Sequence, residues 1–136
     1  MRVSWEEYAL NIATAAAERS EDVYQKVGAC ALNEKNMVVA VGYNGLAPGK
    51  DVSYGFLKNR NYRRPYMIHA EVNCLSLVKR GEVKMLACTL LPCCYCATMI
   101  AAYGIEKVVY REIYKRDTSA LEIFKFYEID CIQYES

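Results

Sequence analysis

The chain has 136 residues, 24% of them charged, and a net charge of +1 at pH 7, so it lacks the charge excess with which proteins bind nucleic acid or anionic membranes non-specifically. No apolar run approaches the roughly 20 residues of a membrane-spanning helix, and the N-terminus shows no signal-peptide pattern, so we expect a single cytoplasmic domain over residues 1–136. In a reducing cytoplasm the seven cysteines are better interpreted as metal ligands and core residues than as disulfides.

The first part of the chain predicts a helix followed by a β-hairpin. Ser4 and Glu7 have the spacing of a capping box, and apolar residues then recur at helical intervals over residues 8–17. Two apolar, partly β-branched runs, residues 27–32 and 37–43, flank a polar turn and predict the hairpin. A glycine-rich segment leads out of the second strand into a long loop.

Residues 50–68 show no clear period and form the most basic stretch of the chain, with Lys58, Arg60, Arg63 and Arg64. A loop of this length in a compact domain is usually functional or part of an interface. The cluster is compatible with a nucleic-acid-binding patch, but the nearly neutral overall charge favours a solvated loop or an interface.

The second half of the chain alternates strands and helices. Strand patterns are predicted at residues 85–91, 107–110 and 129–134, and helical patterns at residues 70–78, 93–103 and 119–126. Together with the opening helix and the hairpin, this order predicts the α/β class, as a three-layer α-β-α sandwich with a mixed five-stranded sheet. In this layout the helices that begin near residues 69 and 93 can start at the same edge of the sheet.

Two short motifs carry the candidate chemistry: His-Ala-Glu at residues 69–71 and Pro-Cys-Cys-Tyr-Cys at residues 92–96. If the proline opens a helix, Cys93 and Cys96 project from one face. His69, the only histidine, gives a third ligand. Three protein ligands leave one tetrahedral position of a zinc ion open for water, as in catalytic zinc sites.

Glu71 follows the histidine by two residues, so it can reach that water without binding the metal, and it is the predicted acid/base group. Other interpretations stay open. The zinc could be a structural ion with Cys74, Cys88 or Cys94 as its fourth ligand. The Cys-x-x-Cys pair could be a redox dithiol, and Glu71 could be an ordinary acid in the first turn of a helix.

Five short segments of the chain together match the motifs of a known family. They are Val27-Gly28-Ala29, Gly42-Tyr43-Asn44-Gly45, His69-Ala70-Glu71-Val72-Asn73, Thr89-Leu90-Leu91-Pro92-Cys93 and Cys96-Ala97. Their order and spacing, from about residue 19 to residue 134, resemble the deoxycytidylate (dCMP) deaminase family of the cytidine deaminase superfamily. The resemblance implies zinc-dependent hydrolytic deamination of dCMP to dUMP and ammonia, which supplies dUMP for thymidylate synthesis. It also implies that His69, Cys93 and Cys96 hold the zinc and that Glu71 moves the protons.

The resemblance implies a substrate site as well. By similarity, Asn44 would bind the sugar-phosphate and the backbone near Ala70 would hold the base. Candidates for the phosphate are Ser20, Lys26, Tyr114 and Lys115. Their hydroxyls and ammonium groups can converge on a dianion.

Members of the family are similar in forming hexamers that dCTP activates and dTTP inhibits, with Mg²⁺ bound beside the effector. By resemblance, such an allosteric site would include Gly42, Tyr43, Gly45 and Asp51. The chain departs from some relatives in a shorter loop over residues 50–68. It also lacks the additional Cys/His set that builds a second, structural zinc in certain viral forms.

Two rival functions are compatible with these motifs. A related deaminase could act on a nucleoside, on RNA or on DNA, and a non-catalytic zinc-stabilised module could use the basic loop to bind nucleic acid. The resemblance favours dCMP as the substrate of a homo-oligomeric enzyme. We expect no membrane partner, and the nearly neutral overall charge argues against a nucleic-acid partner.

Overall fold

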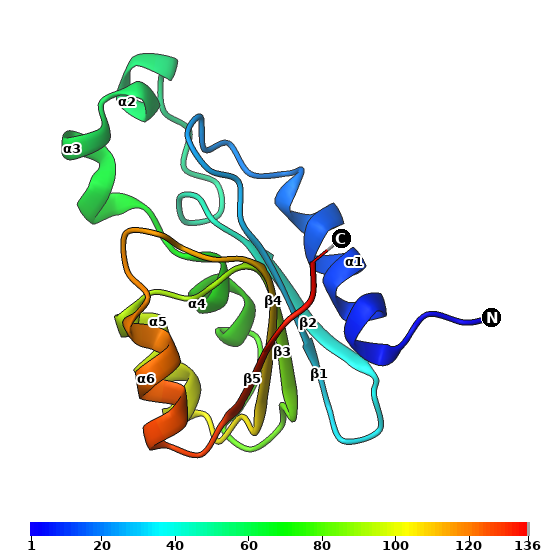
Figure 1. Ribbon diagram of the computed structural model, residues 1–136. Helices are drawn as coiled ribbons and strands as arrows, with labels where there is room; N and C mark the ends of the chain where they lie inside the picture. Colours follow the sequence, from blue (N-terminus) through cyan, green and yellow to red (C-terminus); the bar gives the residue numbers. More distant parts are fainter. Residues whose placement is uncertain (136) are drawn as a thin grey trace.

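The computed structural model describes residues 1–135 and has a mixed five-stranded sheet at its centre (Figure 1). The strands are β1 (Gly28–Leu32), β2 (Val38–Tyr43), β3 (Met85–Leu90), β4 (Lys107–Glu112) and β5 (Asp130–Gln133). In the order β2-β1-β3-β4-β5, β1 is antiparallel to both of its neighbours, whereas β3, β4 and β5 are parallel. The predicted sheet is therefore confirmed, with strand ends that differ from those expected by one or two residues.

The antiparallel pair β1 and β2 is the predicted hairpin, and two asparagines close its turn. The side-chain oxygen of Asn33 accepts hydrogen bonds from the N–H groups of Lys35 and Met37 at 2.9 and 3.0 Å. Asn36 has a φ of 60°, a left-handed conformation that asparagine adopts more readily than most residues. The polar turn between the two apolar runs is thus built from side chains that suit it.

Helices cover both faces of the sheet and complete the three predicted layers (Figure 1). One face carries α1 (Trp5–Ala17), and the other carries α4 (Ala70–Leu75), α5 (Cys94–Ala102) and α6 (Ser119–Phe126). Because side chains alternate along a strand, neighbouring residues enter different cores. Leu32 and Ala87 pack with Leu10 of α1, whereas Ala31 and Leu86 belong to the core on the opposite face.

The first helix begins where the capping pattern places it. The Ser4 hydroxyl accepts a hydrogen bond from the N–H of Glu7 at 3.1 Å, which is one half of the predicted capping box. The helix then lies very close to β1. A Cβ on Gly28 would meet the carbonyl oxygen of Ala13 at 1.8 Å, so only glycine allows this approach.

The long basic loop contains short helices that the sequence pattern did not predict. They are α2 (Tyr54–Lys58), α3 (Arg60–Arg63) and the 3₁₀ turn η1 (Arg64–Tyr66). Ser53 and Asn59 cap α2 and α3 by accepting from the N–H groups of Phe56 and Tyr62 at 3.1 and 3.2 Å. Segments of three to five residues are too short to repeat an apolar position. Residues 54–66, named the helical loop, project beyond one end of the sheet (Figure 1).

The helices that follow the two motifs are shorter than predicted. The helix expected to reach residue 78 ends at Leu75, where the hydroxyl of Ser76 donates to the carbonyl of Asn73 at 2.8 Å and competes with further helix bonds. Because α5 begins at Cys94, Pro92 precedes the helix by two residues instead of opening it. In the described chain, every helix is too short or too polar to cross a bilayer.

Candidate active site

Two of the three predicted metal ligands are helix N-caps. His69 precedes α4 and Cys93 precedes α5, both with extended backbone. Neither side chain caps its own helix, so the imidazole and the thiol remain available for another partner. Cys96 lies three residues after Cys93, in the first turn of α5 and on the same face as that thiol. The starts of two helices therefore supply all three ligands.

The three side chains converge as predicted. Nδ1 of His69 lies 3.3 Å from Sγ of Cys96 and 3.5 Å from Sγ of Cys93. All three donor atoms lie within 4.8 Å of one another. Around a tetrahedral zinc, with Zn–N of about 2.0–2.1 Å and Zn–S of about 2.3 Å, nitrogen and sulfur are about 3.5 Å apart. The donor set therefore fits zinc in chemistry and in spacing.

The other candidate cysteines stay outside this group. Cys74 and Cys88 are fully buried in the core beneath α4 to α6, and burial raises the pKa of the Cys74 thiol to about 12. Cys94 adjoins Cys93, but a helix turns successive side chains about 100° apart. Among residues 1–135, no further histidine, cysteine or carboxylate joins these three ligands as a fourth. Three protein ligands leave one zinc position for water or substrate, which favours a catalytic site over a structural one.

The electrostatics of the thiol pair favour one thiolate. The hydrogen bond from Cys96 lowers the pKa of Cys93 to about 4, against the opposing effect of burial, and the bond with His69 lowers it further. The same thiol–thiol bond raises the pKa of Cys96. A thiolate at a helix start is the form in which cysteine binds a metal.

Glu71 is the second residue of α4 and is only 4% exposed. Burial raises the pKa of its carboxyl group to about 7. Together with His69 and Cys93 it lines a single cavity. A carboxyl group with a pKa near neutrality can both accept and release protons there, as the predicted acid/base role requires.

The cavity beside the ligands has a volume of about 750 Å³, within the range of roughly 300–1,000 Å³ that is typical of small-molecule sites. Its wall comes from the turn after α1, the helical loop, the start of α4 and the loop after β4. The cationic residues that line it are Arg60, Arg63, Arg64, Lys115 and Arg116. Such a wall suits an anionic ligand.

The predicted substrate residues do not all reach this cavity. Asn44, Ala70, Tyr114 and Lys115 line it, and Ser20 and Lys26 are not among its described lining residues. Ser20 is buried and donates to the backbone carbonyl and the side-chain oxygen of Asn44 at 2.8 and 2.7 Å. In this position Ser20 supports Asn44, while the substrate roles of all six residues stay predictions.

Sequence reasoning missed part of the cationic wall. The basic stretch was expected in solvent or at an interface, yet Arg60, Arg63 and Arg64 line the cavity. Arg116 was also missed. The density of basic residues was the available signal. What it could not show is that the helical loop lies next to the loop after β4.

A buried ion pair holds the helical loop on the rest of the domain. Asp22 and Arg63 are 7% and 6% exposed, and the guanidinium meets the carboxylate through two bonds of 2.9 and 3.2 Å. Burial alone would raise the pKa of Asp22, but hydrogen bonds from Arg63, Tyr24 and Gln25 outweigh it and hold this pKa below its usual value. The pair is therefore ionised at neutral pH.

Asp22→Asn is expected to lower the free energy of unfolding by about 3–5 kcal/mol at neutral pH, because it leaves the buried Arg63 without a counter-charge. Since the native pKa of Asp22 lies below the unfolded one, this stabilisation is complete above about pH 4 and is lost as the pH falls through the native pKa. Urea unfolding at about pH 7, 5 and 3 measures the difference from wild type. A difference in the free energy of unfolding that did not shrink in acid would contradict the assignment of Asp22 and Arg63 as a buried, ionised pair.

The predicted allosteric residues Gly42, Tyr43, Gly45 and Asp51 lie outside the set of described residues that line the cavity. A Cβ on Gly42 would meet the backbone nitrogen of Cys74 at 2.5 Å, so this glycine permits close packing of α4. Gly45 pairs with Ile68 across an isolated bridge, and Asp51 is exposed. A regulatory role for these residues stays a prediction.

The fold and the three-ligand site agree with one family. The family model of the cytidine and deoxycytidylate deaminase zinc-binding region matches residues 3–112. The chain belongs to this family, which confirms the predicted resemblance and the zinc-binding character of the site.

Within the family the chain is similar to deoxycytidylate deaminases. That of Mycobacterium phage D29 is 37% identical over 123 residues, which cover 80% of this chain and 95% of the phage protein. That of Pongo abelii is 35% identical over 115 residues, which cover 79% of this chain. The chain spans only 65% of the length of that mammalian relative.

A solved structure confirms the fold. The crystal structure of dCMP deaminase from the cyanophage S-TIM5, in complex with dCMP and dUMP, matches with a TM-score of 0.81 and 26% identity. The match covers 98% of this chain and 99% of the cyanophage chain. The predicted α-β-α sandwich is thus the fold of a nucleotide deaminase.

Proposed function

We propose that residues 1–136 are one catalytic domain that hydrolyses dCMP to dUMP and ammonia with the help of zinc. The proposal rests on one observation: a cluster of three zinc-binding side chains borders, through His69 and Cys93, a cavity that a buried carboxyl group and a cationic wall also line. Similarity to a phage deoxycytidylate deaminase over 95% of its length supports it. The product would supply dUMP for thymidylate synthesis.

Glu71 is the proton carrier in this mechanism. When held by His69, Cys93 and Cys96, zinc would supply Lewis-acid activation of water at neutral pH. The Glu71 carboxyl accepts a proton as water adds to carbon 4 of the cytosine ring, and it delivers that proton to ring nitrogen 3. It then helps to protonate the departing amino group, so that C4–NH₂ and water become C4=O and ammonia. Burial keeps this carboxyl out of bulk solvent.

Ala70 and Asn44 are proposed to hold the base and the sugar. Ala70 is the first residue of α4, and N–H groups in the first turn of a helix have no acceptor within that helix. The Asn44 side chain is fixed before substrate arrives, because its oxygen accepts from Ser20 and from the N–H of Val27 at 2.7 and 2.9 Å. A fixed side chain loses little freedom on binding.

The cationic wall is proposed to bind the 5′-phosphate. Tyr114 and Lys115 come from the loop after β4, and Arg60 and Arg64 come from the helical loop. Charged donors form shorter and stronger hydrogen bonds to phosphate oxygens than neutral donors do. Recognition of the phosphate would distinguish dCMP from deoxycytidine.

Among dCMP, deoxycytidine, CMP and single-stranded DNA, the purified protein is expected to release ammonia fastest from dCMP. Losing two charge-assisted hydrogen bonds, worth about 1.5–3 kcal/mol each, should lower kcat/KM for deoxycytidine by at least about 100-fold. Initial rates of ammonia release measure this difference. Preference for deoxycytidine would contradict the phosphate assignment, and faster reaction on single-stranded DNA would favour the nucleic-acid alternative.

We infer that the protein is a homo-oligomer, a hexamer by family resemblance, which dCTP activates and dTTP inhibits with Mg²⁺ beside the triphosphate. An apolar hollow beside α4 and α5, which another copy could cover, supports the assembly; it is lined by the exposed Val72 and Tyr95 and the half-buried Met67 and Met99. The bridge between Gly45 and Ile68 supports the regulation, because it links the glycine segment to the residue before His69.

Effectors are expected to shift the half-saturating concentration of dCMP by about 5- to 150-fold, which is the usual size of an allosteric coupling. The shift should be downward with dCTP and upward with dTTP. Initial-rate curves with each triphosphate and Mg²⁺ measure it, and sedimentation equilibrium gives the oligomeric state. Hyperbolic curves that neither triphosphate changes would lead us to abandon the regulatory proposal.

A further inference from the structure

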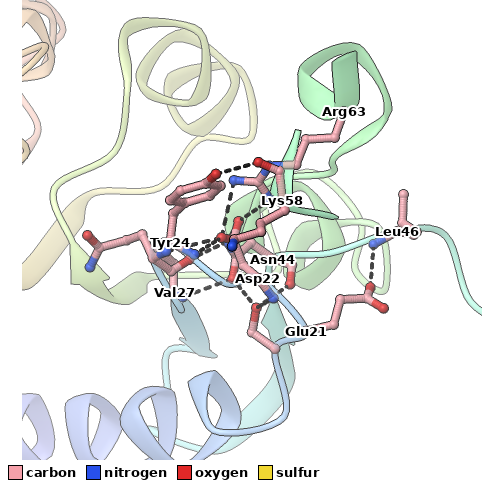
Figure 2. Close-up of polar contacts among 10 residues, drawn as sticks. Glu21, Asp22, Tyr24, Val27, Asn44, Leu46, Lys58 and Arg63 are labelled. Carbon is pink, nitrogen blue, oxygen red and sulfur yellow. Dashed lines mark hydrogen bonds and ion pairs between the residues drawn. The ribbon is translucent and has the colours of Figure 1, made fainter. Parts of the chain in front are cut away.

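Asp22 joins three segments that surround the cavity, although it has no part in the proposed chemistry (Figure 2). Its Oδ1 accepts from the N–H groups of Tyr24 and Gln25 at 2.7 and 3.1 Å, and its Oδ2 accepts from the Asn44 amide at 3.2 Å. Both oxygens also receive the guanidinium of Arg63. One carboxylate therefore connects the turn after α1, the residue after β2 and the helical loop.

Tyr24 extends this anchor along the helical loop. The guanidinium carbons of Arg63 and Arg60 lie 5.0 and 4.7 Å from the centre of its ring, within the range of cation–π attraction. Its hydroxyl donates to the backbone carbonyl of Lys58 (Figure 2). The loop is thus held at Lys58, Arg60 and Arg63 by a single aromatic side chain.

The two arginines differ in burial. Arg63 is buried, whereas Arg60 is exposed, and both line the cavity. Within the described chain, no group accepts a hydrogen bond from Nε of Arg63, so the carboxylate of Asp22 and the Tyr24 ring are what hold its guanidinium. A lysine here would keep the charge but lose the planar fork that matches the carboxylate.

We propose that Asp22 and Arg63 are positioning residues that fix the helical loop so that Arg60 binds the substrate phosphate. This inference rests on the proposed function, because it requires a phosphate in the cavity. Asp22 holds Arg63, Tyr24 holds Arg63 and Arg60 together, and Arg60 meets the dianion. An arginine that is ordered before binding loses less side-chain freedom when the phosphate arrives.

The metal ligand has a separate anchor. Ile68 and Gly45 exchange two backbone hydrogen bonds of 2.7 and 3.0 Å, which fix the chain directly before His69. Loosening the helical loop should therefore weaken phosphate binding more than it disturbs proton transfer. The expected signature is a rise in KM for dCMP with a small change in kcat.

The test compares Arg63→Lys, Asp22→Asn and Arg60→Ala with wild type on dCMP and on deoxycytidine. Arg63→Lys and Asp22→Asn are expected to raise KM for dCMP by roughly 10- to 100-fold and to change kcat by less than about threefold. The ratio of kcat/KM for dCMP to that for deoxycytidine should fall, because deoxycytidine has no phosphate. In the Arg60→Ala background, Arg63→Lys should raise KM for dCMP by less than a further factor of about three, since both residues act through one set of contacts.

Arg111→Lys is the matched control, because the 3.2 Å ion pair of Arg111 and Glu7 joins β4 to α1 and lies outside the lining of the cavity. It should leave the selectivity ratio within about twofold of wild type. Two results would overturn the positioning role alone. One is an equal loss of kcat/KM on dCMP and on deoxycytidine in Arg63→Lys, and the other is an effect of Arg63→Lys on KM for dCMP that is fully additive with that of Arg60→Ala. Wild-type protein that is inactive on dCMP would overturn the proposed function and this inference with it.

Zinc content and thermal unfolding of each variant distinguish misfolding from a displaced loop. Arg63→Lys decides the question where Asp22→Asn is too unstable to assay, because it keeps a cation beside the carboxylate. A stable, zinc-loaded Arg63→Lys protein with an unchanged KM for dCMP would overturn the inference.

Discussion

Glu71→Gln is expected to reduce turnover of dCMP by more than about 10⁴-fold, beyond the roughly 10²–10⁴ of an ordinary acid/base group, because one carboxyl handles several protons in the cycle. Glutamine has nearly the same shape but cannot accept or release a proton at neutral pH. The variant should keep about one zinc per chain, since three other side chains supply the ligands. Ammonia release and metal analysis of the same sample measure both quantities.

Glu122→Gln is the control for this substitution. Glu122 is also an acid in the first turn of a helix, α6, but it is exposed and absent from the described lining of the cavity. If Glu71 were an ordinary first-turn acid, the two variants would behave alike. Loss of zinc from Glu71→Gln would show instead that Glu71 is a ligand, and the role assigned to it would be wrong.

Cys96→Ala is expected to abolish both zinc binding and turnover. Removing a thiolate leaves two protein ligands, and the free energy of zinc binding to such sites depends on a complete donor set. Because Cys96 is 3% exposed in the first turn of α5, the variant should also unfold at a lower temperature than the zinc-loaded wild type. Metal analysis, ammonia release and thermal unfolding measure these losses.

Cys94→Ala is the matched control for Cys96→Ala, since it removes a thiol two residues away in the same helix turn. It should keep zinc and most of the activity. Loss of zinc from Cys94→Ala would support the alternative of a structural ion with four protein ligands. Zinc and turnover that survived in Cys96→Ala would exclude this cysteine as a ligand.

Local patterns in the sequence were sufficient to predict most of the fold. The hairpin follows from two apolar runs around a polar turn, and α1 follows from Ser4 and the apolar spacing after it. The three layers follow from the alternation of strands and helices. These features depend on residues that are close together in the chain, and for that reason they can be predicted from the sequence alone.

Helix boundaries and the helical loop were harder to predict. Pro92 suggested a helix start, but Cys93 takes the N-cap position and moves that start to Cys94. The segments within residues 54–66 are shorter than two turns each, and caps at Ser53 and Asn59 define them instead of a period. Such segments depend on tertiary contacts that a sequence pattern does not report.

The candidate site divides in the same way. His69, Cys93 and Cys96 could be predicted because each motif places its residues within one short segment and the chemistry requires them to meet. The cationic wall could not, because Arg60 and Arg116 come from segments far apart in the chain. Their proximity depends on how the helical loop is anchored.

Gly42 determines how close α4, which carries Glu71 and follows His69, packs against strand β2. A Cβ at this strand position would collide with three backbone atoms of α4, the nitrogen and Cα of Cys74 at 2.5 and 2.9 Å and the oxygen of Ala70 at 2.9 Å. Backbone atoms cannot rotate away from a clash as a side chain can. Any larger residue at position 42 would therefore push α4 away from β2, and His69 and Glu71 would move with the helix. The absence of a side chain on this strand residue therefore sets the position of His69 and Glu71 relative to the sheet.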